Sequence, residues 1–346
     1  MKNKFLLILS LLTTTFAAKA QDATKPVDPP LVVTGSVDTY YKYDFSGHSN
    51  IPTSFATDQN SFSIGMVDIG LKKKVDKAAF VGEVSFGPRG EGQSLLNSGS
   101  NGQSFHVQNL YVSYDLTDHL NVTGGFMATF VGYEVISPAG NFNYSTSYLF
   151  TNGPFQNAGV KFTYAFSDKA SLMAGLFNDY WNAYTSGGKV NTFGAQLMVA
   201  PVKGWNAYIN LVTGPVSGTE LDLTTAYQVT DAFKLGLNAA DFSAPAGTGG
   251  GFNGVALYPQ LAVSPTVTLG LRGEYFKTKS GGFITAGPAP GESVTGLTFT
   301  ANIKGGPLTF IPEVRLDNGS ANMFTDSNMA ATKSASQFSL AAVYAF

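Results

Sequence analysis

Hydrophobic and polar residues alternate along most of this chain with a period of two. In residues 31–45 the odd positions are mainly apolar or aromatic, whereas Asp38, Lys42 and Asp44 stand at even positions. A period of two is typical of a β-strand with one apolar and one polar face. The same separation recurs at residues 120–130, 159–166, 192–199, 267–277 and 308–317.

Marking every stretch of this kind predicts about sixteen strands. Residues 61–74 change phase near Met66, where a β-bulge fits. Residues 119–132 are assigned to one strand, with Phe126 and Phe130 on its apolar face. The predicted strands are 31–45, 61–74, 79–87, 105–115, 119–132, 157–166, 171–180, 191–200, 205–213, 220–229, 233–242, 252–263, 266–277, 293–303, 308–317 and 335–346.

The connections between these strands alternate between short and long. The short ones are 75–78, 116–118, 167–170, 201–204, 230–232, 264–265 and 304–307. The long ones are 46–60, 88–104, 133–156, 181–190, 214–219, 243–251, 278–292 and 318–334. A soluble two-sheet sandwich, the alternative, has no reason to alternate its loops in this way. The sequence therefore predicts an all-β fold, a single closed antiparallel transmembrane β-barrel with short periplasmic turns and long extracellular loops.

The last ten residues of the chain bear on closure of this barrel. Phe338, Leu340, Tyr344 and Phe346 fall on every second position. We expect them to face lipid while the last strand pairs with the first, which removes both edges of the sheet. The terminal aromatics would lie at one membrane boundary, and those of 41–45 at the other. A strand ending in Phe is similar to the signal that the outer-membrane barrel assembly machinery recognises.

The first twenty residues have the pattern of a cleavable signal peptide. A basic start and a short apolar stretch precede the small residues Ala18 and Ala20, so cleavage would leave Gln21 first. The predicted organisation is a signal peptide (1–20), a short periplasmic segment (21–30) and the barrel (31–346). The chain has no Cys, which excludes disulfides and thiol chemistry.

Composition supports a β-rich chain without a nucleic-acid surface. Removing the three lysines of the signal peptide leaves 18 basic and 23 acidic residues, a net charge of −5, with no basic footprint. The 39 Gly, 27 Phe and 16 Tyr suit turns and pleated strands.

Several stretches are similar to the OmpL-like putative β-barrel porin family of Gram-negative outer membranes. They span essentially the whole mature chain: NSFSIGMVDIGL (60–71), FVGEVSFGP (80–88), LYVSYDLTDHLNVTGGFMATFVGYEVI (110–136), NYSTSYLFTNGPFQNAGVKFTYAF (143–166), GLFNDYWN (175–182), ALYPQLAVSPTVTLGLRGEYF (256–276) and PEVRLD (312–317). The resemblance implies an outer-membrane barrel with porin function.

A barrel of sixteen strands leaves an aqueous channel, which predicts passive diffusion of small hydrophilic solutes or ions. Seven acidic and five basic residues fall on the polar face, which favours a weak preference for cations. The alternative is that these charges pair across the lumen and stiffen the wall. They are Asp38, Lys42, Asp44, Glu83, Lys161, Asp222, Lys234, Arg272, Glu274, Glu313, Arg315 and Asp317.

The longest connection, 133–156, lies between the fifth and sixth strands. In this position it resembles the third loop of sixteen-stranded general porins, which folds inward and constricts the pore. That resemblance implies four constriction residues, while the alternative is an ordinary surface loop. Tyr148, Phe150 and Phe155 favour packing inside. The four residues are Glu134, Asn141, Asn143 and Tyr144.

No catalytic or cofactor motif stands out. His48, His106 and His119 fall in different connections or strand ends and do not converge, and the chain has no G-x-S-x-G, P-loop or zinc spacing. We predict a protein that is not an enzyme and needs no cofactor. Its predicted partners are outer-membrane lipid, the assembly machinery and small hydrophilic solutes, with homo-oligomer formation left open. The alternative is an adhesive or structural barrel with a plugged lumen.

Overall fold

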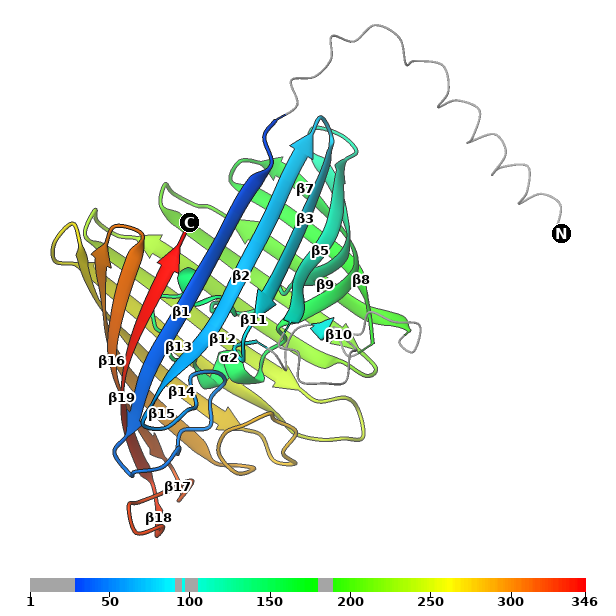
Figure 1. Cartoon of the computed structure of the whole chain (residues 1–346). Helices are drawn as coiled ribbons and strands as arrows, with labels where there is room; N and C mark the ends of the chain where they lie inside the picture. The colour runs from blue at the N-terminus through cyan, green and yellow to red at the C-terminus, as the bar shows by residue number, and fades with distance from the viewer. Residues whose placement is uncertain (1–28, 91–94, 97–104, 180–188) are drawn as a thin grey trace, which may run out of the picture.

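The chain folds into one closed antiparallel β-barrel of sixteen long strands (Figure 1). The structure, a computed structural model, describes residues 29–90, 95–96, 105–179 and 189–346. The long strands are β1 (Val32–Asp44), β2 (Ser61–Val75), β3 (Ala78–Phe86), β5 (Phe105–Asp115), β6 (Leu120–Ala128), β7 (Gln156–Ser167), β8 (Ala170–Asn178), β9 (Val190–Val199), β10 (Trp205–Gly214), β11 (Gly218–Gln228), β12 (Phe233–Ser243), β13 (Gly251–Ala262), β14 (Val267–Thr278), β15 (Ser293–Gly305), β16 (Leu308–Gly319) and β19 (Ser334–Ala345). The predicted fold class is confirmed.

The barrel closes where β19 pairs with β1. Val37 lies opposite Tyr344 and Tyr43 opposite Phe338, and the Gly35 and Phe346 backbones exchange two hydrogen bonds of 3.0 Å. The start of β1 and the end of β19 both lie at the short-turn end of the barrel (Figure 1). A closed sheet leaves no unpaired edge, so every strand has two neighbours.

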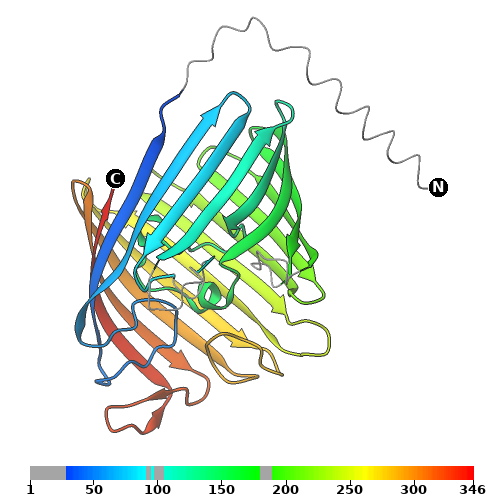
Figure 2. The same ribbon diagram turned by 45° about the vertical axis from the view of Figure 1, so that its right-hand side comes forward.

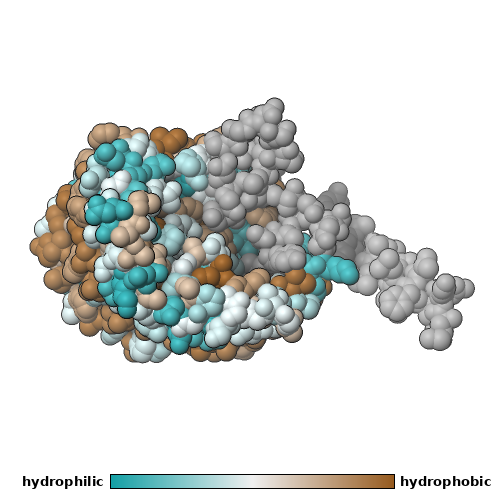
Figure 3. Space-filling model, turned by 90° about the horizontal axis from the view of Figure 1, so that it is seen from below, coloured by the Kyte–Doolittle hydropathy of each residue, from teal (hydrophilic) through white to brown (hydrophobic). Residues whose placement is uncertain are grey.

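The two faces of the wall carry different side chains. Along β15 the outward Phe299 is 51% exposed, whereas its inward neighbours Thr298 and Thr300 are buried. Seen from the long-loop end, the outer wall is largely hydrophobic and much of the rim is hydrophilic (Figure 3). This is the distribution expected of a barrel whose outer face meets lipid. None of the helices among the described residues is long and apolar enough to cross a membrane.

The predicted bulge in the second strand is present. Val37 pairs with Val67 and Thr39 with Ile64, so two residues of β2 lie opposite one residue of β1. The amide of Met66, in the bulge, donates to a carboxylate oxygen of Asp38 at 2.8 Å. The bulge therefore explains the change of phase near Met66.

The prediction that one strand runs from 119 to 132 is wrong at its end. Strand β6 stops at Ala128, and the chain then leaves the wall for the interior. Phe126 is buried instead of exposed, and the ring of Phe130 lies 5.9 Å from that of Phe177 in an apolar cluster. The alternation continues past residue 128 because these aromatics pack inside the protein, which an apolar pattern alone does not distinguish from a lipid face.

Five short elements were not predicted. They are β4 (Leu95–Leu96), the 3-10 helix η1 (Pro138–Gly140), the helix α2 (Tyr148–Asn152), β17 (Phe324–Thr325) and β18 (Ala331–Thr332). None is long enough to show a period. The predicted signal peptide (1–20), most of the 21–30 segment and parts of the predicted loops 88–104 and 181–190 lie outside the described residues.

Candidate functional site

The connection between β6 and β7, residues 129–155, lies inside the barrel. Figure 2 shows this segment, which contains η1 and α2, within the ring of strands. Tyr144 and Tyr148 are 1% and 0% exposed, and Phe150 is buried. We call residues 129–155 the internal loop.

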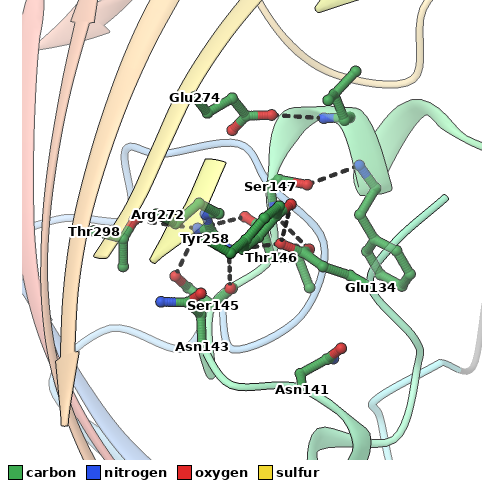
Figure 4. Close-up of polar contacts among 12 residues, drawn as sticks. Glu134, Asn141, Asn143, Ser145, Thr146, Ser147, Tyr258, Arg272, Glu274 and Thr298 are labelled. Atoms are coloured by element: carbon green, nitrogen blue, oxygen red, sulfur yellow. Dashed lines mark hydrogen bonds and ion pairs between the residues drawn. The ribbon is translucent and has the colours of Figure 1, made fainter. Parts of the chain in front are cut away.

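Arg272 of β14 is the centre of one set of contacts to the internal loop (Figure 4). Its Nη1 lies 3.0 Å from a carboxylate oxygen of Glu134 and donates to the carbonyl oxygen of Ser145 at 2.5 Å. Its Nη2 donates to the carbonyl of Thr146 and to the hydroxyl of Thr298, both at 3.2 Å. The guanidinium is thus buried with its charge paired and most of its donors used, as a buried arginine requires.

Two wall carboxylates accept hydrogen bonds from the backbone of the internal loop. Glu313 accepts from the amides of Tyr144 and Ser145 at 3.0 and 3.2 Å. Glu274 accepts from the first two amides of α2, at 3.0 and 2.9 Å. The loop amides have no helix or sheet partner here, so these carboxylates remove the cost of burying them.

Two tyrosines of the internal loop reach wall carboxylates with their hydroxyls. Tyr144 donates to Asp38 at 2.5 Å and Tyr148 to Asp317 at 2.8 Å. Arg315 forms two parallel bonds with Asp317, at 2.8 and 2.9 Å, and also donates to the Thr146 carbonyl. Burial, and then the adjacent carboxylate, raises the pKa of both tyrosines well above its ordinary value, so both hydroxyls stay protonated as donors.

Arg89 joins this network and was missed by the sequence analysis. Its Nε donates to the carbonyl of Ile136 at 2.7 Å, and its guanidinium lies 4.7 Å from the ring centroid of Phe55 and 5.0 Å from that of Tyr144. Cation–π contacts of this kind strengthen when they are desolvated. Arg89 follows a strand in a connection, so the period of two carries no signal for it.

Glycines on the inner wall make room for two aromatic rings of the internal loop. A Cβ added at Gly270 of β14 would lie 2.1 Å from a ring carbon of Phe142, and one at Gly236 of β12 would lie 2.3 Å from the hydroxyl of Tyr133. The Tyr133 ring also stacks on Tyr258, with centroids 4.4 Å apart. Only a residue without a side chain permits such close approach.

The remaining predicted constriction residues take different positions. Asn143 donates to the hydroxyl of Thr300 at 2.7 Å and so joins the contacts to the wall. Asn141 instead bonds the backbone of Val135 through both side-chain atoms, at 2.9 and 2.6 Å. It therefore braces a turn of the internal loop.

The other predicted wall charges are spread around the barrel. Asp222 accepts from the amide of Gly132 at 3.1 Å, at the start of the internal loop. Lys42 and Asp44 bond instead to residues of the 45–60 connection, and Glu83 accepts from Asn109 of β5. Lys161 and Lys234 are half-buried and form no ion pair within the described ranges.

Two cavities separate the internal loop from the wall. One, of about 380 Å³, lies between residues 130–133 and strands β9 to β11. The other, of about 270 Å³, lies between residues 138–142 and strands β13 to β16 with β19. In the part of the chain that the structure describes, no three His, Asp or Glu residues are grouped to hold a metal ion. The site presents hydrogen-bonding groups and charges beside these two cavities.

Comparisons with known proteins agree with this geometry. A family model described as "Putative beta-barrel porin-2, OmpL-like" matches residues 30–346. No curated protein matches the chain. Among solved structures, the outer-membrane channel DcaP of Acinetobacter baumannii has a TM-score of 0.61 at 12% identity, covering 91% of this chain and 97% of that one.

Two further solved structures are similar. OprB of Pseudomonas putida has a TM-score of 0.63 at 11% identity, with 91% and 94% covered. The trimer form of OmpT of Vibrio cholerae has a TM-score of 0.57 at 12% identity, with 92% and 99% covered. At these identities the likeness concerns the fold.

Proposed function

Because this chain belongs to the OmpL-like β-barrel porin-2 family, we propose that it forms a pore narrowed by its internal loop, through which small hydrophilic solutes and ions diffuse passively. The protein is an integral barrel of the outer membrane. Its family and fold point to a channel, and we propose no catalytic role for it.

The fixed position of the internal loop is the observation that carries this proposal. Arg272, Glu274 and Glu313 hold its backbone, and Tyr144 and Tyr148 hold it by their side chains. A loop held at this many points cannot swing out of the lumen without leaving buried charges unpaired. The cavities beside it support a narrowed passage, in which a few side chains control what passes.

The ion preference of this passage is proposed to be weak and in favour of cations. Seven of the twelve predicted wall charges are acidic. Five of these acidic residues already accept hydrogen bonds from the internal loop, which reduces the charge that a passing ion meets. They are Asp38, Asp222, Glu274, Glu313 and Asp317. The reversal potential under a salt gradient measures this preference.

A plugged barrel with an adhesive or structural role is the second candidate. The number of buried contacts between loop and wall favours it, because they fill part of the interior. For either function we propose lipid on the outer face and assembly by the barrel assembly machinery. Association of several copies is proposed by analogy with OmpT, which has been solved as a trimer.

Single-channel recording of the purified protein in planar bilayers tests the proposal. Replacing residues 138–147 with a short glycine–serine linker should raise the conductance and flatten the ion preference. The difference in gel migration between heated and unheated samples should persist, since the strands are untouched. Unchanged conductance in this variant would reject the constriction. Absence of both conductance and liposome swelling in the unaltered protein would favour the plugged barrel.

A further inference from the structure

The larger of the two cavities beside the internal loop carries hydrogen-bonding groups that the protein does not use. Asn206 and Tyr208 of β10 and Thr224 of β11 line it from the wall, and Tyr133 lines it from the internal loop. In the described part of the chain, none of these four side chains makes a hydrogen bond through its polar atoms. A cavity with several uncommitted donors and acceptors on different elements can hold a polar solute in one orientation.

Among the residues that the structure describes, no charged side chain lines the same cavity. The strand that carries Thr224 has two carboxylates, Glu220 and Asp222. Asp222 is the nearer to Thr224 in sequence, and both of its oxygens accept hydrogen bonds. One accepts from Asn210 at 2.6 Å and from the Gly132 amide at 3.1 Å, and the other accepts from Asn238. A charged solute would therefore lose water in this cavity without gaining an ion pair, whereas a neutral solute would not incur that cost.

Two aromatic rings complete the lining. Phe130 packs on Phe177, and one face of Tyr133 is held against Tyr258, so both rings are fixed before any solute arrives. Rigid rings beside amides and hydroxyls match a sugar. The C–H face of a pyranose packs on an aromatic ring, and its hydroxyls bond amide and hydroxyl groups.

We propose that this cavity is a binding site for a neutral sugar, a mono- or disaccharide, inside the channel. The inference rests on the proposed porin function and names the class of solute that the passage favours. The volume of about 380 Å³ lies within the range of ~300–1,000 Å³ usual for small-molecule sites.

Two measurements on the purified, reconstituted protein test this site. The first is the ionic current through single channels in the presence of maltose, which should be reduced in a saturable way. Two control solutes should give no saturable reduction of the current. They are hexaethylene glycol, a flexible neutral solute without a ring, and gluconate, a charged relative of glucose. The second is calorimetric titration of maltose in a detergent without a sugar headgroup, which needs no open pore.

Three variants locate the binding. Tyr208→Phe removes one hydroxyl and keeps the ring, and Asn206→Ala removes one amide. Each should weaken maltose binding about two- to tenfold, the usual effect of one neutral hydrogen bond. Gln260→Ala removes an amide from the smaller cavity and should leave maltose binding unchanged.

The outcomes separate the sugar site from the porin function. A conducting channel without saturable maltose binding would overturn the site and leave the porin function standing. Maltose binding by calorimetry without conductance would support the site and reject the porin function. Binding that survives both Tyr208→Phe and Asn206→Ala unchanged would overturn this cavity as its location.

Discussion

Arg272 of β14 and Glu134 of the internal loop form an ion pair of 3.0 Å although 138 positions separate them. Their side chains are 1% and 6% exposed, so water hardly reaches either charge. Each charge therefore offsets much of the cost of burying the other. The pair joins the wall of the barrel to the segment inside it. Disturbing it should affect stability and conductance together.

Replacing Arg272 with Met should destabilise the protein by about 3–5 kcal/mol, the usual cost of leaving one buried charge unpaired. The carbonyl of Ser145 would lose its donor as well, and the carbonyl of Thr146 would lose one of its two donors. Urea unfolding in detergent micelles measures the loss, and single-channel recording should show noisier currents. The double variant Arg272→Met/Glu134→Gln should recover part of the stability. An unaltered unfolding midpoint in Arg272→Met would contradict a stabilising role for this ion pair.

Gly270→Ala should displace Phe142 from the inner wall, because the new methyl group would overlap its ring. We expect a changed conductance and a loss of about 1 kcal/mol, at the low end of overpacking effects. Gly273→Ala on the same strand is the matched control, since its Cβ would meet only Leu297 at 3.7 Å, an ordinary contact. Equal behaviour of the two variants would contradict the close fit of ring and wall.

The buried tyrosines predict a response to alkaline pH. The pKa of Tyr144 is raised in the folded state, so its contribution to stability is present below about pH 10 and is lost as the pH rises further. Near-ultraviolet titration of the folded protein at about pH 11 should give the same tyrosinate signal with and without Tyr144→Phe. After unfolding, the variant should give less. A smaller signal from the folded variant would mean that water reaches this hydroxyl.

A charged substitution on the outer face of the barrel should lower its stability. Phe299→Lys, near the middle of β15, should cost about 2–4 kcal/mol, as basic residues do at the bilayer midplane. Val202→Lys, in a short turn outside the strands, should cost little. Unfolding from lipid vesicles compares the two. Similar losses would place Phe299 away from the membrane interior.

The strands could be predicted from the sequence because the two faces of each strand lie in different environments, one on the outer surface of the barrel and one in its interior. Leu340 is 42% exposed and Ser339 is buried, and this contrast repeats along the wall and fixes the alternation. The bulge at Met66 could be predicted for the same reason, since one extra residue reverses the alternation.

The contacts of the internal loop could not be predicted in this way. Asn141 braces its own turn through Val135, whereas Glu134 pairs with Arg272. In the sequence the two residues cannot be distinguished, because both are polar residues in a long connection. Which partner each one finds depends on how the loop crosses the interior. Arg89 and Phe130 illustrate the same limit, because neither lies in a strand. The burial of Arg89 has no periodic signal, and the alternation that includes Phe130 predicted a lipid-facing strand although its ring packs on Phe177.

The partners of the internal loop also constrain the order of assembly. Tyr144 bonds Glu313 across 169 positions, and Tyr148 bonds Asp317 across the same separation. Both carboxylates lie on β16, which is synthesised long after the loop, so the loop completes its hydrogen bonds only when the last third of the chain is in place. Contacts of such long range form slowly, because the ends of a long segment must first meet. We therefore expect the internal loop to narrow the lumen only in the final steps of barrel assembly.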